Sequence, residues 1–236
     1  MKKLDADVIV IGGGNAAFAA AISATETGSS VIVLERAPEE EAGGNTRFTA
    51  GAIRFAYNGV EDLKKLMPDL TKTEIENTDF GIYSEEQFFD DMGRITEYRT
   101  DPDLCEQLVT KSKSTLMWMQ HHGIRFAPIY GRQAFKVNGK FKFWGGLTVE
   151  AWGGGPGLID SWKKIAKREH VSIRYSARAI KLLVNDDGVY GVEVQESGKR
   201  VRLIANAIVL ASGGFEANTE WRARYLGPGW DTAKVR

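Results

Sequence analysis

Residues 6–35 read ADVIVIGGGNAAFAAAISATETGSSVIVLE, and this stretch decides the fold. It predicts a strand that enters a glycine turn, an alanine-rich helix to about Thr27, a second strand at 31–34 and a terminal acid. Gly12 allows the tight turn, and Gly14 lets the backbone approach a pyrophosphate held at the helix N-terminus. Glu35, 23 residues after Gly12, can accept a hydrogen bond from an adenosine ribose. The pattern predicts a dinucleotide-binding βαβ unit, and an ordinary βαβ unit with a glycine turn is the alternative.

The terminal acid narrows the ligand only in part. Glu35 favours a free ribose hydroxyl and disfavours a 2′-phosphate, which argues against NADP. NAD and FAD both satisfy the fingerprint. Alanines at Ala17 and Ala21 replace two glycines of the usual motif and still permit close packing of the helix on the strand.

The amino-acid composition limits the classes of function that the chain can have. With 236 residues, 43% of them hydrophobic, the chain can bury a sizeable core. Its 31 basic and 31 acidic residues balance, so nothing predicts binding to nucleic acid or to an anionic membrane. No apolar run approaches the roughly 18 residues that span a bilayer, and the first strand begins too early to leave room for a signal peptide. Cys105 is the only cysteine, so we expect no disulfide, a reducing compartment and a cytoplasmic protein.

The rest of the chain alternates helical and strand patterns. Helices are predicted at 60–67, 84–98 and 102–122, followed by short aromatic strands within 124–150. A glycine cluster at 153–157 precedes a helix at about 158–169 and a strand at 171–175. A β-meander is predicted at 178–184, 189–195 and 199–204, and a separate last strand at 207–211 runs into glycines. A strand buried on both faces and ending in glycines is typical of a central parallel strand that meets a cofactor.

This order of elements resembles the FAD-binding domain of the fumarate reductase and succinate dehydrogenase flavoprotein family. Four stretches carry the resemblance: GGGNAA at 12–17 with Glu35-Arg36, GGNT with its following TAG at 43–51, SARAIKL at 176–182 and VLASGGFEAN at 209–218. NAD domains have no matching GGNT loop, so the resemblance favours FAD. Within the family the chain looks most like the FAD-dependent tricarballylate dehydrogenase branch, through GGNTR, TLMWMQHHGIRF and the ending GFEANTEWRARYLGPGWDTAKVR.

The resemblance implies an α/β fold: a Rossmann-like FAD-binding domain with a parallel central sheet, a β-meander and a helical insertion. We expect its βαβ core at 5–56, the helical and aromatic insertion at about 57–150, and a helix, meander and return strand at 151–236. Relatives continue into a capping domain and return to finish the FAD domain. Those segments are expected to be absent from this chain, and the catalytic residues with them, so no catalytic residue is assigned.

The resemblance also implies a set of cofactor contacts. They are Gly12, Gly14, Ala16 and Ala17 at the pyrophosphate turn; Glu35 and Arg36 at the ribose; Gly43, Gly44, Asn45, Thr46, Ala50 and Gly51 along the flavin loop; Ala179 at the adenine; and Ala211, Ser212 and Gly213 after the last strand. Some relatives attach flavin to a histidine at the position of Asn45, so noncovalent FAD is expected. Gly51 is also expected to border the substrate.

The implied activity is that of a flavin-dependent dehydrogenase or reductase acting on the CH–CH bond of a di- or tricarboxylate such as tricarballylate, fumarate or succinate. Expected partners are that small carboxylate and an electron-transfer partner, and exposed apolar surface favours self-association. Two alternatives stay open: a flavoenzyme of the same fold with another substrate such as a 3-oxosteroid, and a non-catalytic flavin-binding module. No metal is expected, because no set of ligands has metal-binding spacing.

Three features of the sequence each allow two interpretations. Arg47 and Arg54 can neutralise a polycarboxylate or be solvated surface residues. The cluster at 153–157 can aim a helix N-terminus at an anion or make a tight turn. The aromatic residues at 141–152 can form a wall for ring stacking or pack in the core.

Overall fold

The computed structural model describes residues 4–234. The chain forms two compact units: one combines the residues up to Thr49 with those from Ile159 onward, and the other is Ala50–Leu158. We call them unit 1 and unit 2 and describe each by itself. All the strands of the predicted fingerprint belong to unit 1.

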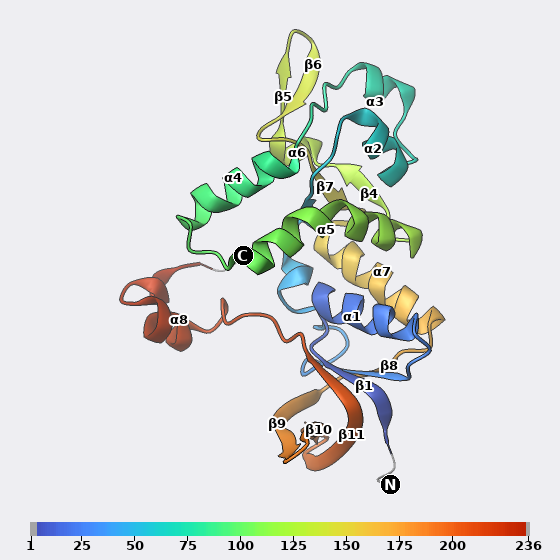
Figure 1. Cartoon of the computed structure of the whole chain (residues 1–236), viewed down its shortest axis with the longest axis vertical. Coiled ribbons are helices and arrows are strands. Elements are labelled where there is room, and N and C mark those ends of the chain that lie inside the picture. Colours follow the sequence, from blue (N-terminus) through green and yellow to red (C-terminus); the bar gives the residue numbers. More distant parts are fainter. Residues whose placement is uncertain (1–3, 235–236) are drawn as a thin grey trace. The chain divides into compact units, whose positions relative to one another are not determined.

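Unit 1 is built on a six-stranded sheet with the order β8-β2-β1-β11-β10-β9 (Figure 1). Its strands are β1 (Ala6–Ile11), β2 (Val31–Leu34), β8 (Ser172–Arg174), β9 (Ala177–Asn185), β10 (Gly188–Glu196) and β11 (Lys199–Leu210). Neighbours from β8 to β11 are parallel, and β11, β10 and β9 are antiparallel. The predicted parallel sheet and meander are confirmed.

The prediction of a separate last strand is wrong, because β11 is one continuous strand of 12 residues. Its first half pairs antiparallel with β10, from Lys199 to Ile204. Its second half pairs parallel with β1, from Ala205 to Leu210. A single strand therefore serves as both the last strand of the meander and a central parallel strand, and the change of partner occurs without a turn.

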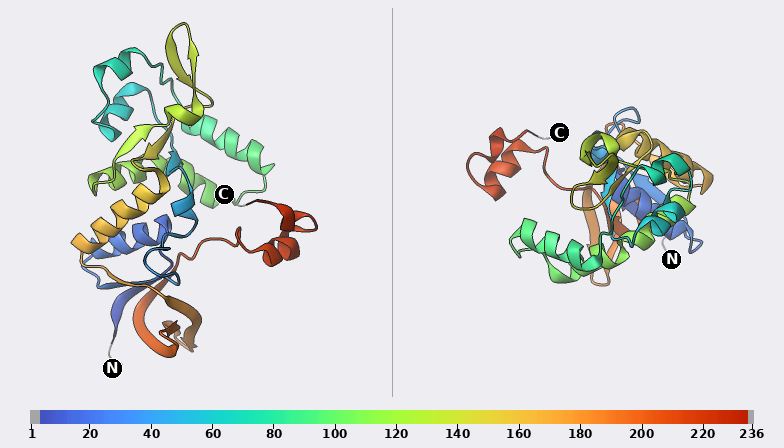
Figure 2. Two further views of the ribbon diagram at one scale, coloured as in Figure 1. Left: turned by 180° about the vertical axis from the view of Figure 1, so that it is seen from behind. Right: turned by 90° about the horizontal axis from the view of Figure 1, so that it is seen from above.

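Side chains alternate across the sheet and give it two buried faces. On one face Ile9 and Leu34 pack against the meander through Val192, Val194 and Leu203. Helices α1 (Asn15–Thr25) and α7 (Gly154–Arg168) lie side by side in both ribbon views (Figures 1 and 2). Phe18 of α1 stacks on Trp162 of α7 with ring centroids 6.5 Å apart. Trp162 is fully buried, so this stack anchors the helical layer.

The C-terminal part of unit 1 holds α8 (Thr219–Leu226) and the short helix η2 (Trp230–Thr232). Asn218 caps α8 by accepting a hydrogen bond from the Trp221 backbone N–H at 3.0 Å. The buried guanidinium of Arg222 donates to the carbonyl oxygens of Glu216, Trp230 and Asp231. Arg222 therefore ties the segments on both sides of α8 into one small module.

Unit 2 is mainly helical, with a three-stranded antiparallel sheet and one hairpin. Its elements are β3 (Ala52–Arg54), α2 (Val60–Leu66), α3 (Lys72–Glu76), α4 (Glu85–Thr96), α5 (Pro102–His121), β4 (Phe126–Pro128), α6 (Tyr130–Gln133), β5 (Ala134–Val137), β6 (Lys140–Phe143) and β7 (Thr148–Ala151). The sheet order is β3-β7-β4, and β5 pairs with β6. The helices predicted near 60, 84 and 102 are confirmed. Asn138 and Gly139, between β5 and β6, both have positive φ, as a two-residue type I′ hairpin turn requires.

The structure places two of the features that allow two interpretations. The helix predicted from about 158 begins at Gly154, so most of the glycine cluster forms its first turn. Phe143 stacks on Phe80 with centroids 6.0 Å apart and also packs on Tyr130, so these aromatic residues belong to the core of unit 2. Trp144 is 70% exposed and lies against Phe135.

Tyr83 gives unit 2 a predicted alkaline pH dependence. Burial, and then the hydrogen bond that its hydroxyl donates to Asp91 Oδ2 at 2.9 Å, raise the pKa of Tyr83 to about 12. An unfolded tyrosine ionises near pH 10. The folded state therefore keeps a proton that the unfolded state loses, and the stabilisation present below pH 10 is lost as the pH rises towards 12.

We expect Tyr83→Phe to flatten this part of the pH profile. Urea unfolding measured at intervals from pH 8 to 12 checks it, with tyrosinate absorbance recorded in parallel. Equal slopes in the wild type and the variant would contradict the assignment to Tyr83.

Candidate cofactor site

The glycine turn after β1 is closed in by backbone on two sides. The Gly12 N–H donates to the Leu34 carbonyl at 2.9 Å, and the Ala211 N–H donates to the Ile11 carbonyl at 2.8 Å. Gly12 has a φ of +120°, and a Cβ placed on it would lie 2.8 Å from the Ala211 carbonyl carbon and closer still to its oxygen. The ends of β1, β2 and β11 therefore meet at a point that only glycine can occupy.

Glu35 lies directly beside this turn. Its side chain is buried, and its Oε1 accepts a hydrogen bond from the Ala37 N–H at 2.8 Å. A Cβ on Gly13 would lie 3.2 Å from both Cβ and Cδ of Glu35 and closer still to Oε2. The carboxylate is thus held against the glycine turn with acceptor capacity left for a ribose hydroxyl. Arg36, predicted beside it, is exposed.

Helix α1 begins without a side-chain cap of its own. Gly14 is the N-cap residue, and the Asn15 N–H is capped from elsewhere by Thr46 Oγ1 at 3.1 Å. Among residues 4–234 no acceptor is recorded for the N–H groups of Ala16 and Ala17. A helix start with open N–H groups carries partial positive charge and suits an anion such as a diphosphate.

The predicted flavin loop lies across this helix start. Gly43 has a φ of +125°, and a Cβ on it would lie 3.0 Å from Ile159 Cγ1. The next residues form the short helix η1 (Gly44–Phe48). A Cβ on Gly14 would lie 3.3 Å from Thr46 Oγ1, so glycine at this position lets the loop approach the turn. Asn45 Nδ2 donates to Glu216 Oε2 at 2.9 Å, which joins the loop to the segment after β11.

The remaining predicted contacts of unit 1 have different surroundings. Ala211 lies under Gly12, whereas Ser212 and Gly213 are exposed. Ala179 lies in β9, and β9 reaches the site through Ala177, whose N–H donates to the Glu35 carbonyl at 2.9 Å. The structure therefore brings Gly12, Gly14, Glu35, Thr46 and Ala211 together directly.

An aromatic residue borders the Glu35 side of the site. Tyr175 directly follows β8, the strand next to β2. Lys163 Nζ lies 5.3 Å from the Tyr175 ring centroid and donates to the Glu39 carbonyl at 3.0 Å. Burial, followed by the negative charges of Glu39 and Glu35, raises the pKa of the Tyr175 phenol. Tyr175 stays neutral and aromatic at physiological pH.

Ala50 and Gly51 belong to unit 2. Gly51 has a φ of +64°, and a Cβ on it would lie 2.8 Å from the backbone of Gly154. Its carbonyl accepts a hydrogen bond from the Ala151 N–H at 2.9 Å. Gly51 is thus needed for the packing of unit 2, and its role towards flavin or substrate stays a prediction.

The two candidate arginines have contacts within their own units. Arg47 Nη1 donates to the carbonyl oxygens of Glu40 and Ala42. Arg54 lies 4.7 Å over the Tyr83 ring centroid and donates to the Gly145 carbonyl. These contacts favour structural roles for both side chains.

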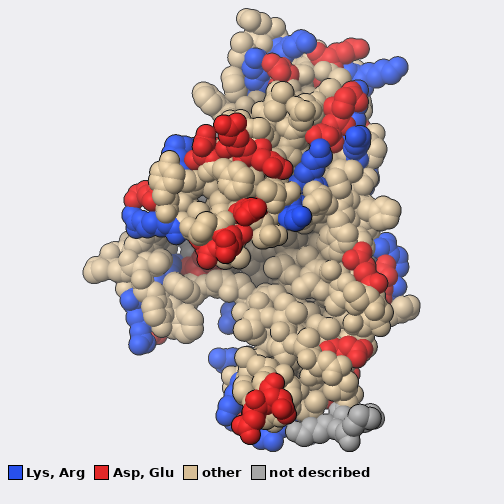
Figure 3. Space-filling view, in the orientation of Figure 1, with Lys and Arg blue, Asp and Glu red and all other residues tan. Residues whose placement is uncertain are grey.

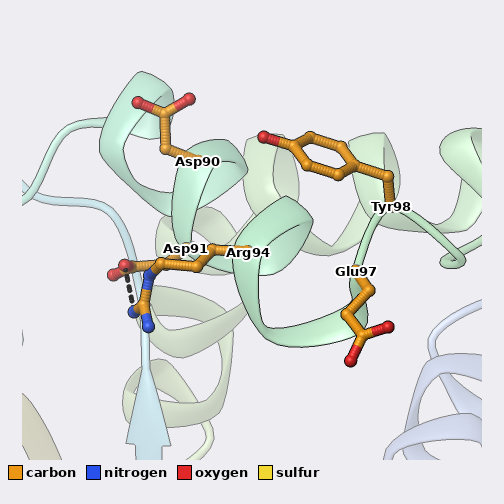
Figure 4. Close-up of a pocket in the computed structure, with 5 residues that line it drawn as sticks. All are labelled: Asp90, Asp91, Arg94, Glu97 and Tyr98. Atoms are coloured by element: carbon orange, nitrogen blue, oxygen red, sulfur yellow. Dashed lines mark hydrogen bonds and ion pairs between the residues drawn. The ribbon is translucent and has the colours of Figure 1, made fainter.

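An open depression of about 620 Å³ lies in unit 2 and is lined by Asp90, Asp91, Arg94, Glu97 and Tyr98 (Figure 4). Acidic side chains gather over α4 (Figure 3), and Arg94 pairs with Asp91 at 2.9 Å. None of the lining residues is a predicted cofactor contact. A depression with this excess of carboxylates is unsuited to an anionic substrate.

Three residues at or next to the candidate site were not predicted from the sequence: Gly13, Asn15 and Trp162. Gly13 packs on Glu35, and Asn15 accepts a hydrogen bond through Oδ1 from Trp162 Nε1 at 2.7 Å. The sequence could have indicated Gly13, because it lies between Gly12 and Gly14 in a run of three glycines. Asn15 and Trp162 are 147 residues apart, so no local pattern connects them.

The anionic half of FAD fits these residues. The open N–H groups of α1, the turn at Gly12–Gly14 and the Glu35 carboxylate supply what a diphosphate and a ribose require.

Within the described part of the chain, no helix is long and apolar enough to cross a membrane. The same residues contain no group of three or more His, Cys, Asp or Glu side chains placed to hold a metal ion.

Comparisons with known proteins agree with this fit. The FAD binding domain family matches residues 7–233. Fumarate reductase (cytochrome) from Shewanella frigidimarina is 31% identical over 216 residues, which cover 91% of this chain and 34% of that protein. NADH:acrylate oxidoreductase from Vibrio harveyi is 28% identical, with 93% of this chain and 25% of that protein covered.

Among solved structures, the open conformation of a flavocytochrome c3 fumarate reductase matches with a TM-score of 0.70 and 27% identity. The match covers 93% of this chain and 36% of that one. The chain thus spans about a third of the length of the fumarate reductase and a quarter of the length of the NADH:acrylate oxidoreductase. With the family matched over nearly its whole length, the chain belongs to the FAD binding domain family.

Proposed function

We propose that this chain is the FAD-binding portion of a flavin-dependent oxidoreductase that acts on the CH–CH bond of a small di- or tricarboxylate. The observation that carries the proposal is the joint placement of the Gly12–Gly14 turn, the start of α1 and the Glu35 carboxylate. Two relatives that match most of the chain are named fumarate reductase and NADH:acrylate oxidoreductase, and fumarate and acrylate are both small carboxylates with a carbon–carbon double bond.

Tricarballylate is the substrate we propose within this class. GGNTR at 43–47, TLMWMQHHGIRF at 115–126 and the ending at 214–236 resemble the tricarballylate dehydrogenase branch. A tricarboxylate requires cationic groups that neutralise its charge. Because Arg47 and Arg54 have internal partners, we assign that task to residues other than these two.

When bound, FAD supplies the acceptor and donor of hydride. The chain's own residues bind and orient it. The N–H groups at the start of α1 hold the diphosphate, and Glu35 accepts a hydrogen bond from the ribose. Asn45 has an amide that forms no covalent bond to flavin under ordinary conditions, and its Nδ2 is engaged by Glu216. The attachment is therefore proposed to be noncovalent.

An absorbance spectrum of the purified protein tests the cofactor. We expect oxidised-flavin bands, and we expect acid precipitation to release all of the colour into the supernatant as FAD. Colour in the pellet would overturn noncovalent attachment. A colourless protein that takes up no added FAD would overturn the proposed cofactor role.

A substrate panel tests the activity. The protein that carries this chain is assayed for dye reduction with tricarballylate, succinate and a 3-oxosteroid, and for oxidation of a reduced viologen with fumarate. Turnover of tricarballylate above the others supports the proposal. Turnover of the steroid alone supports the alternative substrate, and bound FAD without turnover of any of them supports a flavin-binding module.

A further inference from the structure

Asn15, the first residue of α1, is oriented by a buried tryptophan of α7. Trp162 Nε1 donates to Asn15 Oδ1 at 2.7 Å, and the Trp162 ring is fully buried and stacked on Phe18. An indole N–H can only donate, so its partner atom on Asn15 must be the carbonyl oxygen. The contact therefore fixes which way the Asn15 amide points, an orientation that is otherwise ambiguous for asparagine.

The fixed amide leaves a donor at the helix start. With Oδ1 turned to Trp162, the Nδ2 group points away from it, and no protein acceptor for Nδ2 is recorded within residues 4–234. Asn15 is partly exposed. Its backbone N–H donates to Thr46 Oγ1 at 3.1 Å and is not available to a ligand. The side-chain amide can therefore serve as a donor in place of the backbone N–H.

We propose that Asn15 Nδ2 donates a hydrogen bond to the diphosphate of FAD and that Trp162 is the positioning residue that aims it. The inference rests on the FAD-binding role proposed above and adds a side-chain donor to the backbone N–H groups of Ala16 and Ala17. A neutral amide is suited to this place, because it adds a donor to the partial positive charge of the helix start.

Asn15→Asp is the decisive variant. Its carboxylate keeps an acceptor for Trp162 and places negative charge at a helix N-terminus, so the unfolding temperature without ligand should be no lower than that of the wild type. The same carboxylate removes the donor and repels the diphosphate. We expect the dissociation constants of FAD and of ADP to rise by more than about tenfold, and the loss to shrink at high salt.

Trp162→Phe tests the positioning role. Phenylalanine keeps an aromatic ring beside Phe18 and removes the indole N–H together with part of the buried ring volume, a loss that is the same in both backgrounds. We expect FAD to bind about threefold to tenfold more weakly in the wild-type background. In an Asn15→Ala background the same substitution should leave FAD affinity unchanged, because no amide is left to orient. Equal weakening in both backgrounds would overturn the positioning role.

Matched controls are Asn138→Asp in the β5–β6 turn and Trp144→Phe, which make the same chemical changes outside the site and should leave both dissociation constants unchanged. If Asn15→Asp shifts them by less than twofold, the inference is overturned. If the wild type binds ADP but not FAD, the flavin role fails, and the effect of Asn15→Asp on ADP still decides the inference. If it binds neither, both fail.

Discussion

Replacing Gly12 by alanine is expected to lower the free energy of unfolding by at least about 3 kcal/mol and to abolish FAD retention. The added Cβ would lie 2.8 Å from the Ala211 carbonyl carbon and 3.0 Å from Ser212 Cα. Both neighbours are backbone, so no change of rotamer can relieve the contact. The φ of +120° adds conformational strain for any residue with a Cβ.

Gly28→Ala is the matched control for this substitution. Gly28 also has positive φ, +80°, but no atom lies within 4 Å of a Cβ placed there. It should lose only the cost of backbone strain, on the order of 1 kcal/mol, and keep its flavin. Urea unfolding without FAD and the flavin content of each purified protein measure the difference. Equal losses in the two variants would show that contact with Ala211 does not decide the turn.

The parts of the fold that depend on neighbouring residues could be predicted from the sequence. Strand, turn, helix, strand and acid follow one another within residues 6–35, so Gly12, Gly14 and Glu35 follow from spacing alone. The double role of β11 could not be predicted, because its partner changes from β10 to β1 midway without a turn in the chain. Local patterns report turns, and they do not report a change of partner.

The candidate site shows the same division. Spacing predicts a carboxylate near the glycine turn, but it does not predict that Glu35 packs onto Gly13. The contacts of Asn15 with Trp162 and of Asn45 with Glu216 join segments 147 and 171 residues apart. Such pairs depend on how the sheet brings strand ends together. The helix is predicted from about 158 because glycines usually lie outside helices, at their ends. In the structure it begins at Gly154, and glycines form its first turn.

The contact between Gly13 and Glu35 makes the second large effect testable. Gly13→Ala should raise the dissociation constant of FAD by about 30-fold or more and destabilise the protein by about 1–2 kcal/mol. Gly13 does not have positive φ, so alanine meets no backbone strain there. Its Cβ instead displaces the Glu35 carboxyl group, which then loses its hydrogen bond with the Ala37 N–H and its place as the ribose acceptor.

A double-mutant cycle with Glu35→Ala separates this conflict from a general effect of alanine at the turn. Glu35→Ala alone should weaken FAD binding by removing the acceptor. In that background the carboxyl group is gone and only the 3.2 Å approach to Cβ of residue 35 remains, so Gly13→Ala should cost clearly less free energy of unfolding than it does in the wild type. Gly131→Ala, at a glycine of α6 with open space around it, controls for the alanine itself. If Gly13→Ala is equally costly with and without the Glu35 carboxyl group, then side-chain packing at the turn is not what holds the ribose acceptor in place.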